Sequence, residues 1–167
     1  AAGGAEQQRD GRAGMLWSLA GNAALAADDA ARAHTDLDRA LASPALSPAM
    51  RGEAWFDRAR AEFALNDLKD ARISLDAGLK LVPADPFGWL LSATLARRDD
   101  DLDRAEKDVG EAARLAPDDA EVALEAGNVA AARGVIDAAR IAWARAVELA
   151  PGDPAGKAAA QALAANR

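Results

Sequence analysis

Three prolines recur at a constant interval, and this interval restricts the fold more than any other feature of the chain. The positions of Pro83, Pro117 and Pro151 differ by 34 in each step, and a similar run of small and apolar residues precedes each proline. Trp55 and Trp89 have the same spacing. A constant period of roughly 20 to 50 residues is typical of repeat proteins, in which similar units stack on their neighbours. The sequence therefore predicts an array of similar units.

The period extends toward the N-terminus with one insertion. The interval from Trp17 to Trp55 is 38, which is four more than the period. The extra residues fall in segment 44–48, between the first and second units. Because an α-helix has about 3.6 residues per turn, four extra residues can lengthen a helix without rotating its apolar face. The predicted repeats are therefore 14–47, 48–83, 84–117 and 118–151.

Each unit has apolar residues at helical spacing, interrupted near its middle by Asp, Asn or Gly. This pattern predicts two short antiparallel helices per unit and an all-α fold. Ser47 followed by Pro48 has the form of a helix start. The predicted helices span 14–27, 30–42, 48–65, 68–81, 85–98, 102–115, 119–132 and 136–149.

The two flanking segments are interpreted separately. Residues 1–13 are expected to be the tail of a second helix from a preceding repeat, ending near Arg9, so that the chain would be the C-terminal part of a longer solenoid. In 152–167, Asp153 and Pro154 repeat the start signal of a helix. This segment is predicted to be a capping helix that covers the apolar face of the last repeat.

The residues at equivalent positions resemble the tetratricopeptide repeat. The third unit shows the pattern in full, with Trp89, Ser92-Ala93, Ala105, Val109, Ala112 and Pro117. The fourth unit departs by having Ala123 at the Trp position, the second has Arg58 where a larger apolar residue is usual, and the first has Pro44 one position early. The resemblance implies a right-handed α-solenoid, forming one continuous domain over about 14–151.

In that family the first helices of successive repeats line a concave groove that usually holds the ligand. The register of the resemblance implies a groove lined by Asn22, Phe56, Arg60, Phe63, Phe87, Leu90, Thr94, Arg97 and Asn128. The apolar members are the expected anchors, because peptide grooves combine an apolar centre with polar groups. Asn and Arg side chains can bond the backbone of a bound segment. Two alternatives stay open: the Phe side chains pack as core, and the polar side chains are only solvated.

A subset of the family grips the C-terminal carboxylate of chaperone peptides with inward Lys, Asn and Arg. The matching positions here are Ser18, Asn22, Asp57, Phe87 and Leu91. Such a carboxylate clamp is therefore not expected. The strongest expectation for binding falls on 53–97.

Chemical sites are not predicted. His34 is the single histidine and is expected to be exposed on a second helix, and the chain has no cysteine. The sequence therefore offers neither a nucleophile paired with a base nor a thiolate metal site. Asp101 and Asp103 fall in an alternating acidic stretch, but Arg104 stands where a calcium loop needs Gly. No cofactor, metal or catalytic activity is expected. A net charge of −7 argues against nucleic acid as a partner.

The predicted function is a protein-protein interaction module that binds a peptide or helical segment of an unidentified partner. The alternative is a self-assembly module that forms homo-oligomers through exposed repeat faces, and a third possibility is a regulatory segment attached to an enzyme. The sequence has no apolar run of about 18 residues, so membrane insertion is not expected. The excess of Ala, Arg, Asp and Gly favours a bacterial source. The expected location is the cell envelope if a signal peptide was removed, and otherwise the cytoplasm.

Overall fold

The computed structural model describes residues 2–166, with side chains from residue 12 onward. All regular structure in this range is α-helical, and the chain divides into two compact units, Ala1–Pro83 and Ala84–Arg167. The division coincides with the boundary between the predicted second and third repeats. The helices are α1 (Ala2–Ala26), α2 (Ala30–Ala42), α3 (Pro48–Ala64) and α4 (Leu68–Leu81) in unit 1, and α5 (Pro86–Arg98), α6 (Leu102–Leu115), α7 (Ala120–Ala132), α8 (Ile136–Leu149) and α9 (Pro154–Ala165) in unit 2.

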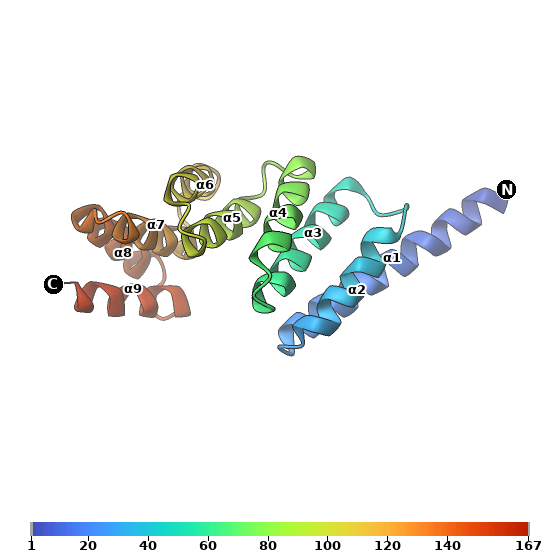
Figure 1. Cartoon of the computed structure of the whole chain (residues 1–167), viewed down its shortest axis with the longest axis horizontal. Coiled ribbons are helices and arrows are strands. Elements are labelled where there is room, and N and C mark those ends of the chain that lie inside the picture. The colour runs from blue at the N-terminus through green and yellow to red at the C-terminus, as the bar shows by residue number, and fades with distance from the viewer. Residues whose placement is uncertain (1, 167) are drawn as a thin grey trace. The chain divides into compact units, whose positions relative to one another are not determined.

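Unit 1 contains two helix pairs, α1 with α2 and α3 with α4 (Figure 1). Helix α3 also packs on α1 and α2, so the first helices of the two repeats are neighbours. Leu37 of α2 is completely buried and packs with Ala33, Ala54 and Ala61. The small residues allow the helix backbones to approach closely, as the sequence pattern predicted.

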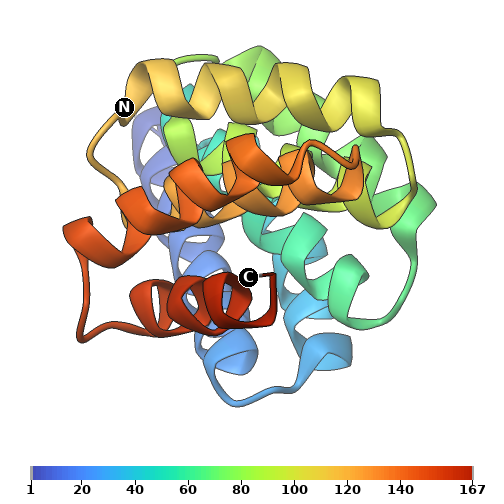
Figure 2. The ribbon, with the colours of Figure 1, turned by 90° about the vertical axis from the view of Figure 1, so that its left-hand side faces the viewer.

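Unit 2 contains the pairs α5 with α6 and α7 with α8, followed by α9. Helix α9 packs on α7 and α8, and Figure 2 shows it in red beside the orange helices. Trp143 of α8 is the bulky centre of this region, in a cluster with Ala139, Ala146 and Ala159 of α9. A side chain at Gly127 would overlap the Trp143 ring, so α7 can approach α8 only with glycine there. The C-terminal segment therefore covers the last repeat, as predicted for a cap.

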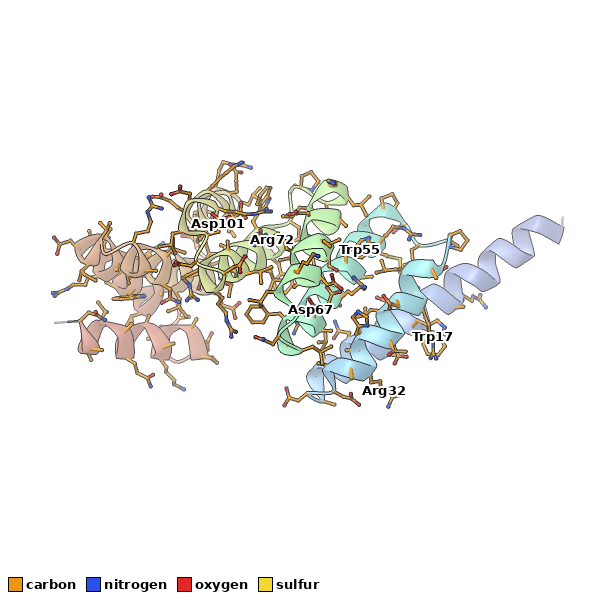
Figure 3. All side chains as sticks on the ribbon, viewed as in Figure 1. Trp17, Arg32, Trp55, Asp67, Arg72 and Asp101 are labelled. Carbon is orange, nitrogen blue, oxygen red and sulfur yellow. The ribbon has the colours of Figure 1, made fainter. Side chains whose placement is uncertain are left out.

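The turn between the two helices of each repeat has the same backbone conformation. Asp28, Asn66, Asp100 and Gly134 all have positive φ, with values of 57°, 62°, 60° and 78°. Asn, Asp and Gly are the residues that adopt this left-handed conformation most readily. In the first three repeats the following Asp caps the second helix, since its carboxylate accepts a backbone N–H bond; these caps are Asp29, Asp67 and Asp101, of which Figure 3 labels the last two.

The eight predicted helices are present, and apart from the start of α1 their ends agree with the predictions to within one residue. Helix α3 has 17 residues against 13 in α5 and α7, so the four-residue insertion adds one helical turn, as expected. Arg51, in the first turns of α3, donates to the carbonyl oxygens of Leu41 and Ser43 at 2.7 and 2.6 Å. This bond pair holds the beginning of α3 against the end of α2.

The N-terminal segment differs from the expectation. A separate antiparallel helix ending near Arg9 would require a turn before the first repeat, but α1 runs from Ala2 to Ala26 without a break. Residues 2–13 therefore extend the first helix of repeat 1. Ala1 lies outside the described residues.

Candidate functional site

The residues predicted to line a groove lie on the first helices of the repeats. In unit 1 these are α1 and α3, which pack side by side, and in unit 2 they are α5 and α7, which also pack together. We refer to these two surfaces as the first-helix faces. That of unit 1 carries Asn22, Asp57, Arg60 and Phe63, and that of unit 2 carries Phe87, Thr94, Arg97, Glu125 and Asn128.

Two of the expected apolar anchors belong to the core. Phe56 is 1% exposed and lies over Gly78, where an added Cβ would stand 2.5 Å from its ring. Leu90 is 9% exposed and packs with Ala112 and Val122. The structure therefore places Phe56 in the core, which is the alternative that the sequence left open for the Phe side chains, and it buries Leu90 in the core as well.

The remaining apolar candidates are accessible. Phe63 is half-buried on α3, and Phe87, in the first turn of α5, is 40% exposed. Thr94 is half-buried, and its hydroxyl donates to the carbonyl oxygen of Leu90 at 3.0 Å, one turn earlier in the same helix. Phe63 and Phe87 are therefore the aromatic side chains of the predicted set that retain exposed surface.

A carboxylate connects the first helices of unit 1. Asp57 of α3 accepts a hydrogen bond from the Asn22 amide of α1 at 3.0 Å through one oxygen. Its other oxygen accepts from Arg60 at 2.9 Å, one turn later on α3. Asn22, Asp57 and Arg60 thus form one hydrogen-bonded row across α1 and α3.

The same arrangement recurs in unit 2. Glu125 of α7 accepts two bonds from the Arg97 guanidinium of α5, at 2.7 and 3.1 Å. The Asn128 amide donates to Glu125 at 3.2 Å, and its carbonyl oxygen accepts from the Trp143 indole at 3.1 Å. Because both ends of the Asn128 amide are bonded, its orientation is determined by the core residue Trp143.

Asp57 and Glu125 are therefore the residues that organise the two faces, although neither was among the predicted site residues. Their positions differ by 68, which is twice the period, so they are equivalent residues of the second and fourth repeats. An acidic residue at that position, three residues before Arg60 or Asn128, was the available signal. Its meaning depends on the partner from the preceding first helix, which local sequence does not identify.

On both faces the Arg side chain is paired with the carboxylate: Arg60 with Asp57, and Arg97 with Glu125. Arg97 is 26% exposed and Glu125 7% exposed at the side chain, so this two-bond ion pair is largely shielded from solvent. An Arg already paired with an intramolecular carboxylate offers little net charge to a second carboxylate, but its remaining N–H groups can donate to neutral carbonyl oxygens. The faces therefore suit a neutral peptide backbone better than a C-terminal carboxylate.

A second polar cluster lies between the helices of unit 1. Buried Ser74 donates to Glu62 at 2.6 Å, and Arg58 donates to Ser74 at 2.7 Å and to Asp38 at 2.7 Å. Arg58 also stands 2.7 Å from the second oxygen of Glu62, in an ion pair whose geometry does not form a hydrogen bond. Burial raises the pKa of Glu62 despite these partners.

His34 adjoins this cluster. Its side chain is 30% exposed, with its two nitrogens 3.6 Å from Asp38 and 3.5 Å from Glu62. The expectation of an exposed histidine is thus corrected, because α3 brings Glu62 against the second helix of the first repeat. The cluster joins α2, α3 and α4 and is a structural feature of the stack.

Among the side chains of residues 12–166 no group of three or more His, Asp or Glu is placed to hold a metal ion. None of the helices within residues 2–166 is both long and apolar enough to cross a membrane.

Comparisons with known proteins agree with this architecture. A family model described as tetratricopeptide repeat matches residues 18–86 and 90–154. No curated protein sequence matches the chain. Among solved structures, YrrB, described as a TPR protein with an unusual peptide-binding site, has 18% identity and a TM-score of 0.72, over 90% of this chain and 74% of that one.

Two further structures show the same fold. TTC0263, a thermophilic TPR protein of Thermus thermophilus, has 21% identity and a TM-score of 0.72, over 95% of this chain and 82% of its own. The first TPR of Spaghetti (RPAP3), bound to an HSP90 peptide, has 19% identity and a TM-score of 0.61, over 70% of this chain and 95% of its own. The tetratricopeptide repeat is a protein-interaction module, and proteins built from it are generally non-enzymatic scaffolds.

Proposed function

Because this chain belongs to the tetratricopeptide repeat family, we propose that it binds a peptide or helical segment of a partner protein on its first-helix faces. The segment would pack its apolar side chains against Phe63 or Phe87. Its backbone carbonyl groups would accept from the amides and guanidinium groups beside them. The partner is a polypeptide, and the binding is non-covalent.

One observation supports this proposal above the others, namely the carboxylate row that recurs in both units. Asn22, Asp57 and Arg60 form it in unit 1, and Arg97, Glu125 and Asn128 in unit 2. Each row holds N–H donors in one orientation before any ligand arrives. Groups held in place lose less conformational entropy on binding, and affinity benefits accordingly. Two solved structures of the same fold are described with bound or binding peptides, which is consistent with such a role.

The test begins with peptides selected from a random library on the immobilised wild-type chain. Their affinities are then measured by calorimetry for Asn22→Ala in unit 1 and Arg97→Gln in unit 2. We expect at least one of these variants to bind about tenfold more weakly, which corresponds to about 1.4 kcal/mol. The variant that loses affinity identifies the unit that carries the site.

The matched control is Arg140→Gln, an exposed position on α8, a second helix. This variant removes one Arg, as Arg97→Gln does, and should change affinity less than about twofold. Circular dichroism must show that all three variants are folded. If selected peptides bind Asn22→Ala and Arg97→Gln as tightly as the wild type, the first-helix faces are not the binding site.

Self-association is a second candidate, and exposed leucines on α1 favour it. Leu16 and Leu19 are 66% and 63% exposed and lie one turn apart on the same helix. Burying them against a second copy would remove apolar surface from water. Sedimentation of the wild type and of a Leu16→Glu, Leu19→Glu double variant tests this role. A monomer at all concentrations in the wild type would eliminate it.

A further inference from the structure

The first position of the repeat pattern is occupied differently in the last repeat. Trp17, Trp55 and Trp89 stand at this position in the first three repeats, and Figure 3 shows Trp17 on α1 and Trp55 on α3. Trp89 packs against a core cluster of α5, α6 and α7. In the fourth repeat Ala123 takes the position, so a large aromatic side chain is replaced by a methyl group.

The surface around Ala123 is hollowed. A depression of about 380 Å³ opens there between α7, α8 and the end of α6, which is within the usual size of a site that accepts an organic group. Ile141 at its edge is 74% exposed, so its side chain is available to contact a group that enters the depression. The lining is apolar except for one Arg, and includes Pro117, Val122, Ala123, Ala126, Ile141 and Arg145.

In the first repeat, which has tryptophan at this position, an arginine stacks on the ring. The Arg39 guanidinium lies over the Trp17 ring, 4.5 Å from its centroid. The offset from Trp17 to Arg39 along the chain is 22, and the offset from Ala123 to Arg145 is the same. The second and third repeats have Ala77 and Glu111 at this position. The fourth repeat thus keeps the cation of the first but lacks the ring beneath it.

Existing ion pairs do not prevent the stacking. Arg39 stacks on Trp17 while it also contacts Asp36 at 3.5 Å. Arg145 is 48% exposed and donates to Asp118 at 2.7 Å. Since a carboxylate bonds the edge of a guanidinium and an aromatic ring contacts its face, one Arg can make both contacts.

We propose that this depression is a second binding site, which accepts a tryptophan side chain from a partner polypeptide. The indole fills the space that the repeat's own tryptophan occupies elsewhere in the chain, with Ile141 against its edge and the Arg145 guanidinium over its face. Tryptophan is the side chain that most often anchors an interface, and its ring attracts cations most strongly. The site is built from α7 and α8 together with Ala113 of α6 and Pro117, and it shares no lining residue with the first-helix faces.

The chain offers a simple spectroscopic test. It contains three isoleucines, Ile73, Ile136 and Ile141, so selective methyl labelling yields three resolved probes of the whole chain in NMR spectra. N-acetyl-tryptophanamide serves as the ligand. We expect a saturable shift of the Ile141 methyl signal, with a dissociation constant on the order of 1 mM, as suits a single side chain. Ile73, in unit 1, is the internal control and should not shift.

Three variants make the test specific. Ala123→Trp restores the tryptophan of the repeat and should abolish the shift. Ala123→Leu is a smaller change that should weaken binding, and it replaces the first variant if Ala123→Trp does not fold. Arg145→Gln should weaken binding about two- to fivefold, as expected for loss of a cation–π contact. N-acetyl-leucinamide should bind more weakly than the tryptophan derivative.

The proposal is overturned if the Ile141 methyl signal of the wild type does not respond to N-acetyl-tryptophanamide, or if Ala123→Trp responds as the wild type does. Self-association of the wild type that Ala123→Trp removes would instead assign the depression to a second copy of this chain. That result would overturn the assignment to a partner.

Discussion

Replacing Phe56 by Ala separates its role in the core from a role in binding. Phe56 is 1% exposed and fills the space over Gly78, where α3 meets α4. Truncating a buried Phe removes its transfer free energy and leaves a cavity, which together cost about 3 to 5 kcal/mol. Glycine at 78 adds no side chain that could move into the cavity. We therefore expect a loss of stability at the upper end of that range.

Phe87→Ala is the matched variant, since the same atoms are removed from a side chain that is 40% exposed. Full burial of a Phe contributes about 1.5 to 3 kcal/mol, so a side chain with about three fifths of that burial should cost roughly 1 to 2 kcal/mol. The two substitutions are thus predicted to differ by about 2 kcal/mol or more in the free energy of unfolding.

Urea unfolding followed by circular dichroism measures this difference. With a slope of about 2 kcal/mol per molar urea, Phe56→Ala should lower the midpoint by about 1.5 to 2.5 M. If the two units unfold separately, the shift belongs to the transition of unit 1, and each transition must be fitted by itself. A loss below about 1 kcal/mol, or one no greater than that of Phe87→Ala, would refute the assignment of Phe56 to the core.

Two further predictions concern buried polar groups. Asn128→Ala removes the acceptor of the Trp143 indole N–H. Because Trp143 is 3% exposed, the unpaired donor should lower the free energy of unfolding in urea by about 1 to 3 kcal/mol. A change near zero would show that this bond does not orient Asn128. Glu62→Gln tests the raised pKa of Glu62: the folded state holds this proton more tightly than the unfolded state, so the stabilisation is complete below pH 4.5 and is lost as pH rises through the folded pKa. The stability of the wild type minus that of Glu62→Gln should therefore fall as pH rises from 4.5, whereas a constant or rising difference would contradict the effect of burial.

The helices and their ends were predictable because their signals are local. Positive-φ residues such as Asn66 and Gly134 mark the turns, and the carboxylate of Asp67 bonds a backbone N–H only three residues away. Even the four-residue insertion appeared as one additional turn of α3. The start of α1 was not predictable, because nothing in residues 2–13 marks whether a helix there ends or continues.

The register predicted which helices carry the candidate residues, but not how their side chains are buried or paired. The register placed Asn22, Arg97 and Asn128 on the first helices, where the structure has them, but it also placed Phe56 among the anchors. A position on a first helix does not specify how deeply a side chain is buried, because that depends on the helix packed against it. Gly78 on α4 leaves the space that Phe56 enters.

The sequence by itself determined the repeat period, the family and the succession of helices, because these follow from short-range backbone preferences and from a pattern that occurs in four successive units. Only the tertiary structure decided which side chains meet. The pairing of Asn22 with Asp57, of Arg97 with Glu125 and of Asn128 with Trp143 joins residues 35, 28 and 15 positions apart. Such contacts depend on how neighbouring helices stack, and the same stacking leaves a hollow where Ala123 replaces tryptophan.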